Sequence, residues 1–197
     1  MKNTVVLVVL ILLVSVLVYL GLDTLGLMPV QASQQAEGID WLFNIEVMAI
    51  SFLFALIVVP LVYSLVVFRR RPGEEGDGEH IEGNFKLEII WTVIPLLIVI
   101  ALAYVGAWSL GDVIRADPGA MVVEVDAFQW GWKFYYPEEG ITTNELYLPV
   151  DRQVLLEMES SDVIHSFWVP EFRIKQDIVP GQTTEYRVTP TEEGEYM

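Results

Sequence analysis

The most informative stretch of this sequence runs Asp162-Val163-Ile164-His165-Ser166-Phe167-Trp168-Val169-Pro170. Within it, alternate residues form two sets that are both largely apolar, a pattern that predicts a β-strand with two apolar faces. Pro170 is expected to end the strand, because proline has no N–H to donate to a neighbouring strand. The stretch therefore indicates a β-sheet domain in the second half of the chain.

His165 is the one histidine of that half, and its residue type allows two interpretations. An imidazole in an apolar strand can be a core side chain that is hydrogen-bonded to a backbone carbonyl. A neutral imidazole is also a common protein ligand for copper and zinc. One histidine does not make a metal site, so the pattern around His165 leaves both interpretations open.

The composition combines features that rarely occur together in one soluble domain. Apolar residues make up 53% of the 197 residues, yet the formal net charge is −16. Residues 112–197 alone carry 17 acidic and 6 basic side chains. This combination indicates membrane segments attached to an acidic domain, which would repel nucleic acid and attract cationic partners. The sequence contains no cysteine, which excludes disulfides and any thiolate metal site made by these residues alone.

Three uncharged runs, at residues 3–22, 47–68 and 89–111, are each long enough to cross a bilayer as a helix. The first run could instead be a signal peptide, with a cleavage site near Val30-Gln31-Ala32. It is longer than the apolar core of an ordinary signal peptide, so we expect a retained helix. Residues 22–40 are expected to form a polar connection.

The placement of lysine and arginine predicts the orientation in the membrane. Lys2, Arg69–Arg71 and Lys86 fall on one side, whereas residues 21–46 carry no base. The positive-inside rule then puts the amino terminus and the loop at 69–86 in the cytoplasm and residues 112–197 outside. His80 lies in that cytoplasmic loop, so it is not expected to share a metal with His165.

From Ala120 onward the apolar residues alternate with polar ones, as expected for strands, and Pro and Gly residues mark turns between them. Short strands at this spacing predict an antiparallel sandwich or a Greek-key barrel. We therefore expect an added helix and connection at 1–40, a transmembrane hairpin at 41–111 and an external β domain at 112–197.

Two further features each have a structural and a functional interpretation. The segment Gln129-Trp130-Gly131-Trp132-Lys133-Phe134-Tyr135-Tyr136 puts four aromatic residues on one face, which core packing would explain. One of its indoles near the surface could instead relay electrons or anchor a partner. Glu88, before the third run, is explained by the dipole at a helix amino terminus, although a carboxylate at the membrane edge can also feed protons to a channel.

Four motifs in order give the chain its resemblance to a known family. They are Phe85-Lys86-Leu87-Glu88-Ile89-Ile90-Trp91-Thr92-Val93-Ile94-Pro95, Gln129-Trp130-Gly131-Trp132, Ser161 to Pro170, and Lys175-Gln176-Asp177-Ile178-Val179-Pro180-Gly181. From about residue 42 onward the chain resembles subunit II of the haem-copper respiratory oxidases, in its cytochrome c oxidase form. The resemblance implies a fold of three transmembrane helices and an all-β, cupredoxin-like Greek-key domain outside a bacterial plasma membrane.

The resemblance also implies a function and roles for particular residues. The external domain would hold a dinuclear copper A centre, which accepts electrons from cytochrome c or a similar donor. It would pass them to haem in subunit I, which also holds copper B, within a proton-pumping oxidase that includes subunit III. His165 matches a copper ligand, Trp130 the tryptophan that receives electrons, and Glu88 the glutamate at the mouth of a proton pathway.

Donor docking is assigned to the acidic charge of the external domain, with Glu138, Glu139 and Asp162 as the candidate residues. Membrane lipid is the other expected contact.

The sequence departs from the family pattern in one respect that matters. The other copper ligands of the family lie in a Cys-x-x-x-Cys-x-x-x-His-x-x-Met segment, and the 197 residues contain no cysteine. We expect that segment to lie beyond Met197.

Two alternative functions remain. One is subunit II of a quinol oxidase, a structural module without copper, although such relatives usually lack a histidine at the position of His165. The other is a membrane-tethered module that binds a cationic ligand and has no part in respiration.

Overall fold

The computed structural model describes residues 2–196 except 71, 74–75, 77–79 and 81. The chain forms two compact units. The first combines Met1–Leu27 with Phe43–Val105, and the second combines Met28–Leu42 with Gly106–Met197. The second unit therefore includes a segment that precedes the hairpin in sequence.

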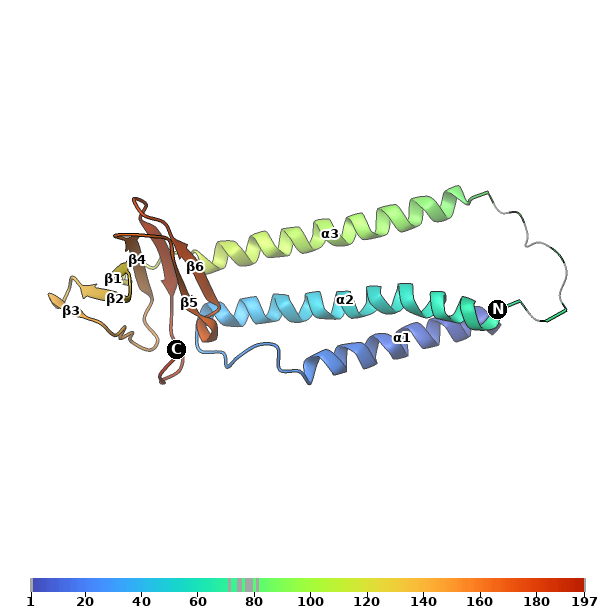
Figure 1. Ribbon diagram of the computed structural model, residues 1–197, viewed down its shortest axis with the longest axis horizontal. Coiled ribbons are helices and arrows are strands. Elements are labelled where there is room, and N and C mark those ends of the chain that lie inside the picture. The colour runs from blue at the N-terminus through green and yellow to red at the C-terminus, as the bar shows by residue number, and fades with distance from the viewer. Residues whose placement is uncertain (1, 71, 74–75, 77–79, 81, 197) are drawn as a thin grey trace. The chain divides into compact units, whose positions relative to one another are not determined.

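Three helices are long and apolar enough to cross a membrane: α1 (Lys2–Asp23), α2 (Gln34–Val67) and α3 (Phe85–Val113) (Figure 1). Their presence confirms the three predicted spans. The polar connection predicted to reach Asp40 is shorter than expected, because α2 already begins at Gln34. Ser33 caps this helix, since its Oγ accepts a hydrogen bond from the Ala36 N–H at 3.1 Å.

The side chain of Asn84 caps the amino terminus of the third helix. The Oδ1 of Asn84 accepts a hydrogen bond from the Leu87 N–H at 3.2 Å, so α3 starts four residues before the uncharged run at 89–111. Several residues of the predicted cytoplasmic loop, Arg71 among them, lie outside the described part of the chain.

The second unit contains a mixed sheet in the order β3-β2-β1-β4-β7. Its strands are β1 (Met121–Phe128), β2 (Gly131–Tyr136), β3 (Ile141–Thr143), β4 (Val154–Ser160) and β7 (Thr184–Val188). The alternation predicted for β1 is confirmed, because Val123, Val125 and Ala127 are buried. The pairing differs from the antiparallel prediction at one place, where β1 runs parallel to β4 in register from Met121↔Val154.

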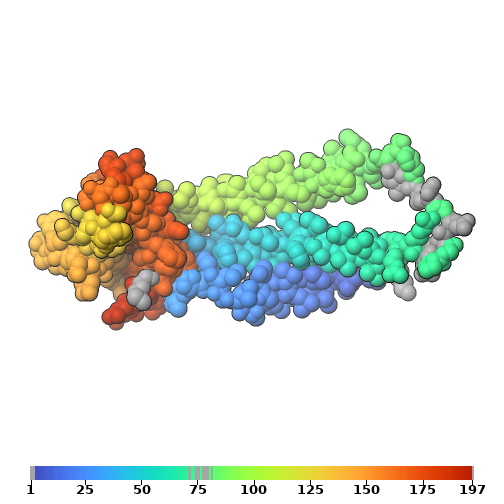
Figure 2. Space-filling model, in the orientation of Figure 1, coloured from blue at the N-terminus to red at the C-terminus, as the bar shows by residue number. Residues whose placement is uncertain are grey.

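A two-stranded layer covers this sheet. It consists of β5 (His165–Val169) and β6 (Ile174–Ile178), joined by the 3₁₀ turn η1 (Pro170–Phe172). Phe167, Ile174 and Ile178 of this layer share one apolar core with the buried side chains of the sheet. The predicted fold class of membrane helices followed by a two-layered β domain is confirmed. Figure 2 shows the β region, coloured yellow to red, as one closely packed mass.

The structure distinguishes the two interpretations of the aromatic segment. Trp130 lies in the turn between β1 and β2 and is 94% exposed, so one indole of the segment lies at the surface and does not share the core face with Phe134 and Tyr136. The strand predicted from residue 163 begins only at His165, and Ile164 is exposed. Pro170 ends that strand, as predicted.

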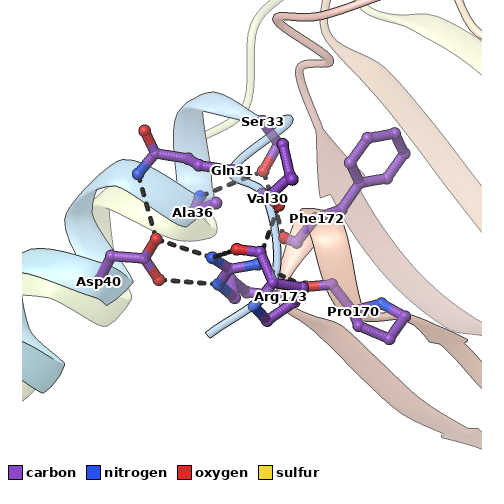
Figure 3. Close-up of polar contacts among 9 residues, drawn as sticks. Val30, Gln31, Ser33, Ala36, Asp40, Pro170, Phe172 and Arg173 are labelled. Atoms are coloured by element: carbon purple, nitrogen blue, oxygen red, sulfur yellow. Dashed lines mark hydrogen bonds and ion pairs between the residues drawn. The ribbon is translucent and has the colours of Figure 1, made fainter. Parts of the chain in front are cut away.

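Arg173 joins the β domain to the segment 28–42 (Figure 3). Its Nε and Nη2 donate to the two carboxylate oxygens of Asp40 at 2.7 and 2.8 Å. Its remaining N–H groups donate to the backbone carbonyls of Pro29, Val30 and Pro170 at 2.8, 3.3 and 2.7 Å. The Arg173 side chain is only 6% exposed, so almost all of its hydrogen-bonding groups are satisfied inside the protein.

Backbone hydrogen bonds attach the same segment at two further places. The Ala32 N–H donates to the carbonyl of Glu171 at 3.1 Å, and the Thr191 N–H donates to the carbonyl of Ala32 at 2.9 Å. Ser33 forms an isolated antiparallel bridge with Pro190, and Ala32 is fully buried in the core of the domain. The connection before α2 is therefore a structural part of the β domain.

We predict that Arg173→Met lowers the free energy of unfolding of the second unit by about 3–5 kcal/mol, because it leaves the Asp40 carboxylate without its partner in a largely buried place. Arg173→Lys should be nearly as harmful, since an ammonium cannot make the two-pronged contact. The measurement is the thermal unfolding of the full chain in detergent, followed by near-ultraviolet circular dichroism.

Arg152→Lys is the matched control, because the Arg152 ion pair with Glu138 is exposed and should contribute no more than about 1 kcal/mol. If the Arg173 and Arg152 variants lost equal amounts of unfolding free energy, the buried ion pair of Arg173 with Asp40 would not stabilise the domain more than an exposed one.

Candidate functional site

His165 opens strand β5 and faces an aromatic neighbour from another part of the chain. The ring of Trp132, in β2, meets the imidazole edge-on with 6.0 Å between ring centroids, and also contacts the Phe167 ring at 5.8 Å. The His165 side chain is 17% exposed. The imidazole is thus held near the surface but against the core.

Asp162 fixes the orientation of that imidazole. Its Oδ1 lies 2.7 Å from Nε2 of His165, so Nε2–H donates to the carboxylate, and in a neutral imidazole with this hydrogen bond the lone pair is on Nδ1. A carboxylate that receives a hydrogen bond from one ring nitrogen is the usual support for a histidine that binds metal through the other. This geometry favours the ligand interpretation of His165 over the carbonyl-bonded core interpretation.

The same carboxylate also holds the turn that carries Trp130. Oδ2 of Asp162 accepts a hydrogen bond from the Gln129 N–H at 2.6 Å, and Oδ1 accepts one from the Val163 N–H at 2.6 Å. The hydrogen bond from His165, followed by these two, lowers the pKa of the Asp162 carboxyl to about 2, against an opposing effect of burial. Asp162 is therefore ionised at neutral pH and connects two loops that lie 33 residues apart.

The indole of Trp130 projects from this turn almost fully into solvent, at 94% exposure. Trp132, two residues later, is partly buried against the core. The segment thus exposes one indole to solvent and packs the next against His165. Gly131 lies between them, and a Cβ at that position would come within 3.1 Å of the Phe128 ring, so the close turn favours glycine.

The described residues do not by themselves form a metal centre. They contain no group of three or more His, Cys, Asp or Glu side chains that could hold a metal ion. A dinuclear copper centre needs soft thiolate ligands besides imidazole, and the sequence has no cysteine. The residues present offer one well-oriented imidazole and do not fit the complete copper A centre.

Two of the other predicted site residues lie away from this cluster. Glu138 and Glu139 occupy the turn after β2, at the opposite end of that strand from Trp130, a separation of about 20 Å for six strand residues. Glu138 pairs with Arg152 at 3.1 Å. Glu88 lies exposed in the first turn of α3, in the other compact unit. Of the predicted residues, the structure therefore brings together His165, Asp162 and the turn that bears Trp130.

Two parts of this arrangement were not predicted from the sequence. Asp162 was predicted to act in docking alone, and its hydrogen bond to His165 was not foreseen. Trp132 was placed in the core without a prediction of its contact with the His165 ring. The second contact depends on the packing of β2 against β5, which no local pattern shows.

Comparison with known proteins assigns the chain to a family. Residues 22–109 match the model described as "Cytochrome C oxidase subunit II, transmembrane domain", and residues 139–197 match "Cytochrome C oxidase subunit II, periplasmic domain". Together with the three apolar helices, these matches confirm a membrane protein with an external C-terminal domain.

Several curated relatives align over most of the chain. "Cytochrome c oxidase subunit 2" of Synechocystis sp. is 36% identical over 87% of this chain and 66% of its own length, and that of Thermostichus vulcanus is 35% identical over 83% and 67%. "Quinol oxidase subunit 2" of Bacillus spizizenii is 33% identical over 74% of this chain and 48% of its own. The chain thus spans about two thirds of the length of the first two relatives.

Among solved structures, the periplasmic domain of subunit II of the cytochrome oxidase of Bradyrhizobium japonicum is 26% identical. The match covers 43% of this chain and 71% of the solved chain, with a TM-score of 0.38. The two family models and the similarity to Synechocystis and Thermostichus proteins along most of the chain lead to one conclusion: the chain belongs to the cytochrome c oxidase subunit II family of respiratory oxidases.

Proposed function

We propose that this chain is the electron-accepting subunit of a cytochrome c oxidase, an oxygen-reducing oxidoreductase complex. The single observation that carries the proposal is the Asp162 carboxylate, which hydrogen-bonds to His165 with one oxygen and to the Gln129 N–H with the other. One charged group thereby holds an exposed indole and a metal-ligand imidazole in a fixed relation.

The roles of the two indoles follow from their exposure. Trp130 is almost fully exposed, so a donor protein could approach its indole ring closely enough to pass an electron to it. Trp132, near the start of β2, contacts the His165 ring edge-on. We assign Trp130 to electron uptake from the donor and Trp132 to packing that holds the imidazole.

We propose that His165 is one ligand of a dinuclear copper A centre, bound through Nδ1, whose other ligands belong to sequence beyond Met197. When bound, that centre would accept and pass on single electrons. The chain's own contribution is to orient the imidazole through Asp162 and to cover one side of the ring with Trp132. Haem and copper B would lie in subunit I.

The proposal extends to the remaining predicted partners. The acidic external domain would attract a basic donor such as cytochrome c, with Glu138, Glu139 and Asp162 contributing. The transmembrane helices would pack against subunits I and III, and Glu88, exposed at the start of α3, would lie at the mouth of a proton pathway in subunit I. Relatives named as quinol oxidase subunits make a copper-free structural module the alternative function.

We predict that His165→Ala abolishes the two-copper centre in protein that carries the expected cysteine segment, because the site has no spare imidazole nearby. The domain should remain folded, since the core of the β sheets is built from other side chains. Electron paramagnetic resonance of the mixed-valence centre is the measurement, and circular dichroism checks the fold. The 197-residue chain should not assemble the centre with or without the substitution.

An unchanged resonance spectrum in the His165→Ala protein would exclude His165 as a ligand. If protein with its complete natural carboxyl terminus binds no copper and is reduced by a quinol instead, the alternative function is correct.

A second prediction separates electron relay from docking at Trp130. Trp130→Phe should leave donor affinity nearly unchanged but slow electron transfer from the bound donor, because the smaller ring lengthens the gap to the acceptor. Stopped-flow reduction by the donor gives both quantities. Reduction by a small artificial reductant should stay near normal in the same variant, and Trp168→Phe is a control at another exposed indole. Loss of affinity with fast transfer after binding would make Trp130 an anchor and not a relay.

A third prediction concerns docking. Glu139→Gln should slow association with a basic donor and reduce the dependence of that rate on ionic strength, because one attractive charge is lost and the Debye length is about 8 Å at physiological salt. Arg115→Gln, a substitution of opposite sign on the same domain, should have the opposite effect. Association rates that stay equal in both variants at every salt concentration would show that the charge of the domain does not steer the donor.

A further inference from the structure

A pocket of about 860 Å³ lies within the second compact unit, where two helices end next to the β domain. Its walls come from the first two turns of α2, the last turns of α3, the connection that follows α3, and Gln153. The side chains that give it chemical character are Glu37, Trp41, Trp108, Asp112, Arg115 and Asp117. The site cluster around His165 contributes none of the lining.

The charges of the pocket are unbalanced. Three carboxylates face one guanidinium, which gives a net charge of −2. Arg115 pairs with Asp112 at 2.9 Å, and Oδ1 of Asp117 accepts the Gly119 N–H at 2.8 Å. Glu37 has no partner within the part of the chain that the structure describes. The pocket thus offers a free carboxylate beside a paired cation.

The position of the pocket relative to the two spans gives it a particular environment. Both α2 and α3 are long and apolar enough to cross a membrane, and the uncharged span begins at residue 47 in α2 and ends at residue 111 in α3. At about 1.5 Å per residue, Trp41 lies about 9 Å outside the first of these span ends and Trp108 lies about 5 Å inside the second. Trp41 and Trp108 line the pocket near these span ends and are 53% and 65% exposed. Indoles concentrate at the lipid headgroup level because they combine an apolar body with a polar N–H.

We propose that this pocket binds the headgroup of a zwitterionic phospholipid. The cationic end of the headgroup lies at the free Glu37 carboxylate and at Asp117, and the phosphate lies at Arg115. Trp41 and Trp108 contact the glycerol region and, for a quaternary ammonium, can also provide cation–π contacts. The net charge of −2 disfavours anionic phospholipids such as phosphatidylglycerol, which carries no cationic group to offset the carboxylates.

Native mass spectrometry of the full chain tests this proposal. Detergent-solubilised protein is mixed with equal amounts of phosphatidylethanolamine, phosphatidylcholine and phosphatidylglycerol, and the retained lipid is counted. We expect retention of the two zwitterionic lipids above that of the anionic one. Glu37→Gln should lower zwitterionic retention by about threefold, the range of a solvent-accessible ion pair. Asp23→Asn, the loss of an acidic charge outside the pocket lining, should change nothing.

A second measurement identifies the place of binding and the kind of occupant. Zwitterionic lipid brominated on its acyl chains should quench fluorescence from Trp41 and Trp108, and the quenching should fall in the Trp41→Phe and Trp108→Phe variants. Soluble glycerophosphoethanolamine should not displace the lipid, because it lacks the acyl chains.

Preferential retention of phosphatidylglycerol, or equal retention by wild type and Glu37→Gln, would overturn the proposal. Displacement by the soluble headgroup would mean that the pocket binds small amines. If quenching of these indoles occurs in the isolated chain but is absent in the assembled oxidase, another subunit covers the pocket and the lipid assignment is wrong.

Discussion

The second compact unit depends on the guanidinium of Arg173, which joins the segment 28–42 to the β domain. The guanidinium binds both oxygens of Asp40 and three backbone carbonyls, from Pro29, Val30 and Pro170, in a place almost closed to water. Because Asp40 lies in α2 and Arg173 follows η1, this one side chain ties a membrane helix to the β domain (Figure 3). The left-handed backbone at Arg173, with φ of 60°, is a strained conformation that these five hydrogen bonds help to hold.

The candidate site also contains one charged side chain that hydrogen-bonds to segments distant in sequence. There the Asp162 carboxylate collects hydrogen bonds from His165, Val163 and the Gln129 N–H. In each case a charged group of fixed geometry joins segments that are distant in sequence. The proposed electron-transfer role would benefit from such rigidity, because a donor contact and an acceptor ligand would have to keep a constant separation.

Much of the fold could be predicted from local pattern. The uncharged runs gave the three helices, and the alternation at Val123, Val125 and Ala127 gave β1. Local pattern did not predict the features that depend on contacts with residues distant in sequence. The period-two pattern did not decide between a core and a surface position for Trp130, and the turn held by Asp162 directs this indole to solvent. The parallel pairing of β1 with β4 and the early start of α2 likewise follow from tertiary contacts. His165 and Trp130 were identified from family motifs, whereas their connection through Asp162 emerged only in three dimensions.

The incorporation of residues 28–42 into the β domain has a consequence for biosynthesis. Ser33 reaches the outer side of the membrane soon after the first span is made, but its partner Phe172 lies 139 residues later. Two further spans must be inserted before the carbonyl that Ser33 binds has been translated. The entropic cost of closing so long a loop rises only slowly with its length, but the search for the contact is slow. Docking of the early segment is therefore a late event in maturation, and a defect in the α1–α2 connection will appear as incomplete folding of the distant C-terminal strands.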